Sequence, residues 1–230
     1  MGRLGLKIGV VIQARMGSSR LPGKVLRRIA DKTLLEHVIG RLEQLRHSAS
    51  VVVATSTQER DAVICEWCNQ YGVNFFRGSE LNVLERYVAC ADHYNFSTIV
   101  RLTADNPFTD IEELDLLLDL HVNFRYDYSH SFGMMPLGVG AEVFSYESLR
   151  RSYADGREPH HLEHVNEYIS EHSEKFSIGV LEVPASKRSP NLRLTVDTEE
   201  DWKRACWLAE QAPGRWIGTE EAIALCSQFA

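Results

Sequence analysis

A short segment near the start of the chain combines three cationic side chains with four small residues. The segment spans residues 13–24, and these side chains are Arg15, Arg20, Lys24, Gly17, Ser18, Ser19 and Gly23. Small residues let backbone N–H groups approach phosphate oxygens, arginine grips a phosphate with two hydrogen bonds, and lysine adds a compact charge. The segment therefore predicts a phosphate-binding loop. A solvated surface loop with ordinary charges is the alternative.

This segment matches neither of the two common phosphate-binding patterns. A Walker A loop has four residues between its glycines and a Ser or Thr after its Lys. Here five residues separate Gly17 from Gly23, and Val25 follows Lys24. The dinucleotide-binding pattern G-x-G-x-x-G is also absent. The segment is thus a phosphate loop of another kind.

Two aspartates follow expected strands. Asp105 comes after the apolar run 97–103, and Asp197 comes after the run 191–196. The carboxyl ends of parallel strands share one edge of a sheet, so both carboxylates are expected to converge on the crevice beside the loop. Such a pair suits Mg²⁺, which binds one or two carboxylates together with phosphate oxygens and water. The alternatives are a turn role for Asp105 and a helix-start role for Asp197.

Three further acids follow Asp197 directly, namely Glu199, Glu200 and Asp201. Any of them can complement the dipole of the helix that is expected to begin here. The spacing of Thr198 to Asp201 is that of a weak capping box. We expect Asp197 to be the metal ligand among the four.

The elements that must position these residues alternate along the first half of the chain. Apolar runs rich in β-branched residues indicate buried strands, and apolar residues at three-to-four spacing indicate amphipathic helices. The expected strands are 7–12, 50–55, 73–76 and 97–103, and the expected helices are 34–45, 62–67, 81–91 and about 110–121. This order predicts an α/β fold with a doubly wound, Rossmann-like, mostly parallel sheet and helices on both faces.

After residue 122 the alternation becomes irregular. The expected strands here are 126–132, 138–145, 176–184 and 191–197, and the expected helices are 145–153, 160–172 and 198–211. No linker or internal repeat separates the two halves. We expect residues 1–230 to form a single domain, in which about 122–190 adds oligomer-forming elements, and we expect a homodimer.

Composition limits the classes of function. With 25 Lys and Arg against 32 Asp and Glu, the net charge of −7 argues against nucleic-acid binding. No apolar run reaches the about 18–20 residues of a membrane span, and no signal-peptide pattern is present, so we expect a cytoplasmic protein that does not enter the membrane. The five scattered cysteines indicate reduced thiols, and the C-x-x-C of Cys65 and Cys68 has no second ligand pair, so a packing role is expected.

Sixteen consecutive residues, VIQARMGSSRLPGKVL, closely resemble the opening motif of the sugar-acid cytidylyltransferases. The similarity is greatest to the spore-coat polysaccharide (SpsF-like) branch and more distant to the CMP-Kdo synthetases. It continues at VATST (53–57), RGSELNVLERY (77–87), VRLTADNPFTD (100–110), GVGAEVFS (138–145), EHVNEYI (163–169) and RLTVDTEEDW (193–202). The resemblance implies a nucleotidyltransferase that makes a CMP-sugar from CTP, releases pyrophosphate and binds Mg²⁺ through Asp105 and Asp197.

We assign roles on this basis. Arg15 and Lys24 are expected to hold the triphosphate and to offset charge while an acceptor hydroxyl attacks the α-phosphorus. The expected nucleotide-binding residues are Gln13, Ala14, Gly17, Ser18, Ser19, Arg20, Thr55, Ser56, Arg77 and Ser79. The expected acceptor-binding residues are Glu142, His164 and Asn166, and the region of about 122–190 that contains them is expected to add acceptor-binding elements to the domain. The chain departs from the branch at Asn82 and Gly140, where acids are usual, and keeps the acid at Glu142.

Two questions stay open at this level. The stretch HHLEH (160–164) suggests zinc at first sight, but it lacks the H-E-x-x-H order and a third ligand, so an acceptor-binding or packing role is preferred. The activity also has alternatives: another nucleoside triphosphate, a sugar phosphate acceptor, or a catalytically silent nucleotide-sugar sensor. The two acids and the complete basic loop argue against a silent protein.

Overall fold

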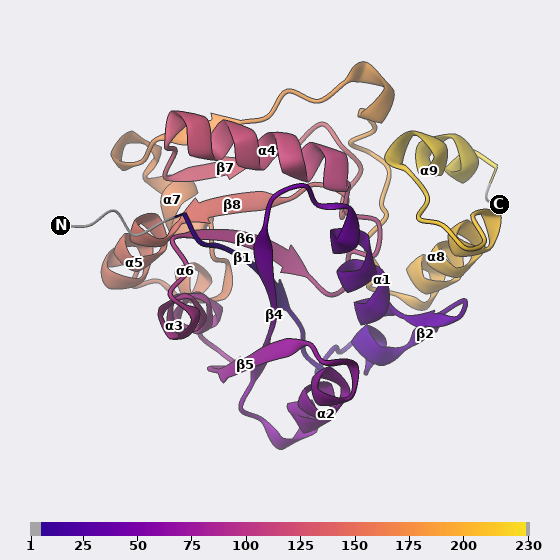
Figure 1. Ribbon diagram of the computed structural model, residues 1–230, viewed down its shortest axis with the longest axis horizontal. Coiled ribbons are helices and arrows are strands. Elements are labelled where there is room, and N and C mark those ends of the chain that lie inside the picture. The colour runs from indigo at the N-terminus through magenta and orange to yellow at the C-terminus, as the bar shows by residue number, and fades with distance from the viewer. Residues whose placement is uncertain (1–5, 229–230) are drawn as a thin grey trace.

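The computed structural model describes residues 6–228, which are built around a seven-stranded sheet (Figure 1). The strand order is β5-β4-β1-β6-β8-β7-β9. The strands are β1 (Ile8–Gln13), β4 (Ala49–Ser56), β5 (Asn74–Gly78), β6 (Thr98–Thr103), β7 (Tyr128–His130), β8 (Glu142–Ser145) and β9 (Ile178–Val180). A separate hairpin, absent from our expectation, joins β2 (Arg28–Ile29) to β3 (Lys32–Thr33).

Parallel pairing dominates the sheet. β1 lies between β4 and β6, with Ile8 level with Ala49 on one side and Thr98 on the other. β4 also pairs with β5 in parallel, whereas β8 runs antiparallel to β6 and β7. These central strands are mostly buried because their apolar runs cover both faces. The expected fold class is confirmed.

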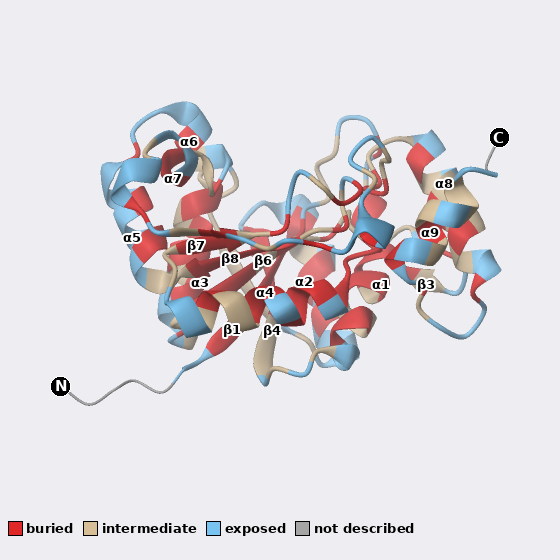
Figure 2. Ribbon diagram, turned by 90° about the horizontal axis from the view of Figure 1, so that it is seen from above, coloured by how far each residue is buried: buried red, intermediate tan, exposed pale blue. Residues whose placement is uncertain are grey.

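Helices cover both faces of the sheet, and Figure 2 shows buried residues gathered along it. They are α1 (Leu34–Arg41), α2 (Ala62–Tyr71), α3 (Val83–Tyr94), α4 (Ile111–Phe124), α5 (Tyr146–Asp155), α6 (Pro159–Glu163), α7 (Glu167–Glu171), α8 (Glu199–Gln211) and α9 (Thr219–Cys226). One apolar cluster joins the sheet to α1, α2 and α4, for example through Val10 and Leu114. The opposite face packs against α3, α5 and α7, for example through Val11 and Leu84.

A third apolar cluster lies at the side of the sheet, around α8 and α9. It contains Leu21 from the loop after β1 and Val196, which precedes Asp197. Both residues are buried, so the cluster anchors two segments that are distant in sequence. The expected capping box also forms, since the side chains of Thr198 and Asp201 each bond the other's backbone at the start of α8.

Two expected elements of the second half were wrong. The helix over 160–172 is divided into α6 and α7, because His164 leaves helical dihedral angles (φ −108°, ψ 103°). The segment 191–197 starts in a turn, bends at Thr195 and forms a single bridge, Leu137 to Arg193, instead of a strand. Its N–H groups bond loop carbonyls, as Leu194 does to Leu137 at 2.8 Å, so no ladder forms. Helix α9 was not expected.

Candidate active site

The loop after β1 and the segment after β6 meet at the carboxyl edge of the sheet. Together they form a pocket of about 440 Å³, here called the loop pocket. Its lining is Gln13, Arg15, Gly17, Ser18, Ser19, Arg20, Lys24, Val25, Arg60, Glu80, Thr103, Ala104, Asp105 and Asp197. The structure thus brings most of the expected loop residues and both expected acids into one concave site. Ala14 is buried beside it and bonds the carbonyl of Ala54 through its N–H at 3.1 Å.

The loop is held by a buried aspartate that the sequence did not single out. Asp61, at the start of α2, accepts a hydrogen bond from the Met16 N–H at 2.7 Å and another from the Ser56 hydroxyl. Asp61 is fully buried, so these two donors satisfy a carboxylate that has no access to water. It ties the loop to the end of β4. A lone acid near a helix start carries no sequence signal for this role.

Lys24 lies at the centre of the acidic side of the loop pocket. Its Nζ donates to Asp105 Oδ2 at 2.7 Å, to Asp197 Oδ1 at 2.8 Å and to the Val196 carbonyl at 2.9 Å. An ammonium group has three donors, so every one is engaged. The side chain is buried, which strengthens its attraction to both carboxylates.

Asp197 lies among three cations. Besides Lys24, it is bonded by Arg193 and lies 3.4 Å from the Arg20 guanidinium. Burial alone raises the pKa of Asp197, but its hydrogen bond to Lys24 and the charges of Lys24, Arg193 and Arg20 lower it below the usual value. The carboxylate is therefore ionised at neutral pH. Arg193 was not among the expected residues, because its closeness to the site comes from the Leu137 bridge.

Asp105 is positioned by its neighbours on both sides. The Thr103 hydroxyl donates to its Oδ1 at 2.6 Å, and Val196 donates its N–H to the Asp105 carbonyl at 2.8 Å. The second bond draws residue 197 to the end of β6. Two carboxylates bonded to one ammonium provide the hard oxygen donors that a divalent cation requires, so the residues fit Mg²⁺.

The other three acids after residue 197 are engaged elsewhere. Glu199 pairs with Arg27, with an Oε1 to Nη2 distance of 2.7 Å. Glu200 is exposed and faces Arg204 at 3.6 Å, and Asp201 caps α8. Among these four acids, only Asp197 contacts Lys24 within the described residues.

A second pocket of about 670 Å³, here called the side pocket, adjoins the first. The two share Gln13, Arg15, Thr103, Asp105 and Asp197. The side pocket adds Arg101, Arg193, Glu163 and His164. Arg15 is exposed, and its guanidinium makes no hydrogen bond or ion pair with any residue of 6–228. An unpaired cation at the junction of two pockets is available for an anionic ligand.

Four expected nucleotide-binding residues are not part of the lining of the loop pocket. Thr55 and Ser56 are fully buried and do not line it, and the Ser56 hydroxyl is bonded to Asp61. Arg77 donates to the carbonyls of Ser56 and Gln58, each at 3.0 Å, and so fixes the turn after β4. Ser79 accepts the N–H of Asn82 at 3.0 Å. The Thr55 hydroxyl is buried and has no hydrogen-bond partner among the described residues.

Of the three expected acceptor-binding residues, one lines the side pocket and two do not. His164 lines the side pocket, whereas Glu142 is buried and bonds Arg101 and the Tyr128 hydroxyl, the latter at 2.8 Å. Burial and Glu142 raise the pKa of Tyr128, against opposing effects of Arg101 and of a hydrogen bond from Asn166. Glu142 and Asn166 therefore support the wall of the side pocket from behind.

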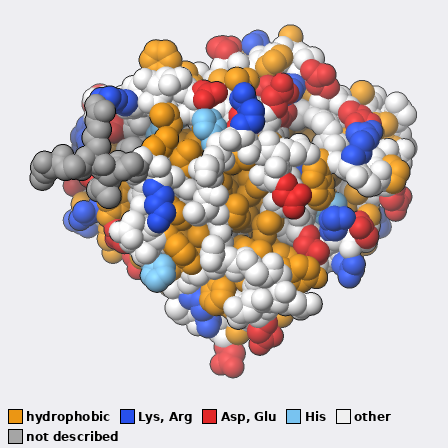
Figure 3. Space-filling model, viewed as in Figure 1, with side chains coloured by type: hydrophobic (Ala, Val, Ile, Leu, Met, Phe, Trp, Pro, Cys, Tyr) orange, Lys and Arg blue, Asp and Glu red, His pale blue; other side chains and the backbone are white. Residues whose placement is uncertain are grey.

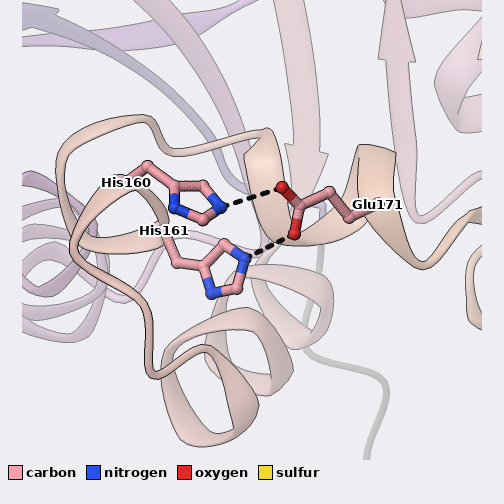
Figure 4. Close-up of side chains that lie close together, drawn as sticks. All are labelled: His160, His161 and Glu171. Carbon is pink, nitrogen blue, oxygen red and sulfur yellow. Dashed lines mark hydrogen bonds and ion pairs between the residues drawn. The ribbon is translucent and has the colours of Figure 1, made fainter.

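Figure 4 shows His160 and His161 of α6 pointing at Glu171 of α7. Their Nε2 atoms lie 2.8 and 2.7 Å from its carboxylate oxygens. His161 Nδ1 accepts the Glu158 N–H at 3.3 Å, so a neutral His161 carries its proton on Nε2, the atom that would bind zinc. The cluster joins two short helices, and Glu171 is the third group that the sequence did not reveal, since the ligand atoms of the three side chains lie within 4.8 Å of one another.

The surface adds two observations. None of the helices in residues 6–228 has the length and apolar character needed to cross a bilayer. On the face drawn in Figure 3, Lys and Arg alternate with Asp and Glu among the described residues, without a continuous basic stripe.

Comparison with known proteins assigns the family. A model described as cytidylyltransferase matches residues 9–226. The spore coat polysaccharide biosynthesis protein SpsF of Bacillus subtilis (strain 168) is 39% identical over 224 residues, covering 95% of this chain and 93% of SpsF. A cytidylyltransferase structure from Leptospira borgpetersenii serovar Hardjo-bovis has a TM-score of 0.90 at 32% identity, covering 97% of this chain and 95% of that one. The structure of CMP:2-keto-3-deoxy-manno-octonic acid synthetase complexed with CTP shares the fold, with a TM-score of 0.71, 19% identity and coverages of 90% and 100%. The resemblance of the opening motif is confirmed: the chain belongs to the cytidylyltransferase family.

Proposed function

We propose that the protein transfers the cytidylyl group of CTP to a hydroxyl of a sugar or sugar acid, forming a CMP-sugar and releasing pyrophosphate. The observation that carries this proposal is the meeting of a basic, glycine-containing loop with two carboxylates in a chain of the cytidylyltransferase family. The name of SpsF refers to spore coat polysaccharide, which supports a role in surface polysaccharide or glycoconjugate biosynthesis.

The two adjoining pockets suggest how the substrates are arranged. The loop pocket takes the triphosphate of CTP, with Arg15 and Lys24 neutralising its charge. The side pocket takes the acceptor, and the shared residues Arg15, Asp105 and Asp197 lie where the acceptor hydroxyl meets the α-phosphorus. Such a step depends on positioning and charge neutralisation and requires no protein nucleophile.

We further propose that Asp105 and Asp197 hold Mg²⁺. When bound, this ion neutralises charge on the triphosphate. The support comes from the residues themselves, because both carboxylates approach a single cationic group and Thr103 orients one of them. Lys24 must exchange at least one of its present partners to contact a phosphate, since all three of its donors are engaged.

The proposal also covers the domain organisation, the oligomeric state and the cellular compartment of the protein. We infer that residues 1–230 act as one domain and that the protein is a homodimer, which light scattering after size exclusion tests. The five cysteines are free, which supports a reducing compartment such as the cytoplasm.

The test is pyrophosphate release with CTP, Mg²⁺ and a panel of octulosonic and nonulosonic acids, with products analysed by mass spectrometry. We expect a CMP adduct of at least one panel member and no comparable product from UTP, ATP or GTP. A larger yield with another nucleotide, or with a sugar phosphate acceptor, contradicts the cytidylyl proposal. Binding of CTP without any product across the panel favours a silent sensor.

A further inference from the structure

Two buried polar atoms in the wall of the side pocket have no hydrogen-bond partner. They are the side-chain oxygen Oε1 of Gln13 and the Nε of Arg101. Both residues line the side pocket. Buried polar groups in folded proteins are nearly always paired, so an unpaired donor and an unpaired acceptor on residues that line a pocket are groups that a bound ligand can pair.

The sheet places these two side chains on the same face. Arg101 of β6 is level with Val11 of β1, and Gln13 is level with Thr103. Partners in register share a face, and so do residues two apart on a strand. Val11, Gln13, Arg101 and Thr103 therefore project to one side of the sheet, and the two unpaired atoms come from adjacent strands.

The charge of Arg101 is already compensated. Glu142 lies directly opposite it on β8 and accepts a hydrogen bond from its Nη1. The Tyr128 hydroxyl occupies the second oxygen of Glu142 at 2.8 Å. Glu142 is fully buried, so this arrangement fixes the guanidinium and neutralises it. The Nε that remains suits a neutral oxygen better than it suits a carboxylate.

We propose that Gln13 and Arg101 together recognise a non-reacting hydroxyl group of the acceptor sugar. A hydroxyl accepts one hydrogen bond, here from Arg101 Nε, and donates one, here to Gln13 Oε1. The inference rests on the proposed function and assigns Gln13 to the acceptor rather than to the nucleotide. Glu142 and Tyr128 act as positioning residues for Arg101.

Steady-state kinetics of three variants test this proposal. The acceptors are 3-deoxy-manno-octulosonate and N-acetylneuraminate, and each variant is measured with the one that the wild type uses better. Gln13→Met removes the oxygen at similar volume, and Arg101→Lys keeps the charge opposite Glu142 but lacks Nε. We expect each to raise the acceptor KM about tenfold while the CTP KM changes less than twofold, because a site loses affinity when a buried pairing is lost. Thermal unfolding verifies that each variant is folded.

Two further variants separate a specific contact from a structural effect. Gln13→Glu keeps an acceptor oxygen and is expected to restore most of the affinity for the acceptor. Trp67→Phe is the matched control, since it removes another buried, unpartnered N–H that lies on α2 outside both pockets. It should leave both KM values unchanged.

The KM values of these variants also define the results that would overturn the proposal. Unchanged acceptor KM in Gln13→Met and Arg101→Lys overturns the inference, and so does an equal rise in the CTP KM. A Gln13→Glu variant weaker than Gln13→Met shows that the pair faces an anion and overturns the hydroxyl assignment. If the wild type releases no pyrophosphate with either acceptor or with the wider panel, the proposed function is refuted, and the inference, which rests on it, is refuted as well.

Discussion

At the scale of single residues, Lys24 controls which cation the carboxylates of Asp105 and Asp197 can bind. Its ammonium lies within 2.7 and 2.8 Å of two carboxylates that would otherwise repel each other. Lys24 and a divalent cation therefore compete for the same oxygens. A nucleotide can relieve this competition, because its phosphates offer Lys24 another anionic partner.

Replacing Lys24 with methionine should separate its effect on metal binding from its effect on turnover. Without the ammonium, Asp105 and Asp197 should bind Mn²⁺ about tenfold more tightly in the absence of CTP, which is a change of about 1.4 kcal/mol. Turnover with CTP should fall at least about a hundredfold, since a charge that stabilises the transition state is lost. Titration calorimetry measures the first effect. Lys32→Met, which removes an exposed ion pair with Asp31, is the control. Weaker Mn²⁺ binding in Lys24→Met refutes the competition.

The acids after β6 and before α8 are tested by amide substitutions. Asp105→Asn and Asp197→Asn should each reduce kcat/KM by at least about a hundredfold, because each removes a hard anionic ligand. Glu200→Gln should stay near the wild-type value, since this side chain is exposed and faces Arg204. Pyrophosphate release at saturating Mg²⁺ provides the comparison. A greater loss in Glu200→Gln than in Asp197→Asn shows that the wrong acid was chosen.

At the scale of elements, the loop after β1 depends on α2 for its shape. Asp61 bonds Met16 in the loop and Ser56 at the end of β4, so one buried carboxylate links three segments. Asp61→Asn leaves an amide where two donors require acceptors, and we expect a loss of about 1–3 kcal/mol in unfolding free energy. The KM for CTP should rise about tenfold. Urea unfolding and initial rates measure both, with the exposed Asp31→Asn as the control. Lower stability with an unchanged KM shows that Asp61 does not shape the phosphate loop.

At the scale of the whole molecule, the packing of α4 against the sheet makes stability depend on pH. His121 is buried on α4, and its Nδ1 lies 3.0 Å from the Ser129 hydroxyl on β7. Burial lowers the pKa of His121 to about 4. In the unfolded chain an ordinary histidine has a pKa of about 6.5. The neutral ring therefore contributes stability that is complete above about pH 6.5.

Below that pH the unfolded state binds the proton first, so this stability is lost as the pH falls from about 6.5 to about 4. The slope from one group is at most about 1.4 kcal/mol per pH unit. His121→Asn keeps a polar atom near Nδ1 but does not titrate, so its unfolding free energy should fall less over this range than that of the wild type. Urea unfolding at several pH values measures the difference. Parallel curves for the two proteins contradict a neutral buried His121.

The sequence by itself determined the α/β class, the alternation from β1 to α4, the loop of cations and small residues after β1, and the position of Asp105 after β6. Those features depend on local patterns, such as apolar periodicity and small residues after a strand, which neighbouring residues carry. The tertiary structure alone decided the division at His164, the path of 191–197 that brings Asp197 to the site, and the partners of Lys24. Lys24 and Asp197 are 173 positions apart, and their contact depends on how the Leu137 bridge and the α8 cluster bring that segment back to β6. A contact between residues so far apart leaves no pattern in the neighbouring sequence. It results from the burial of apolar residues, and many other arrangements of the same chain would also bury them.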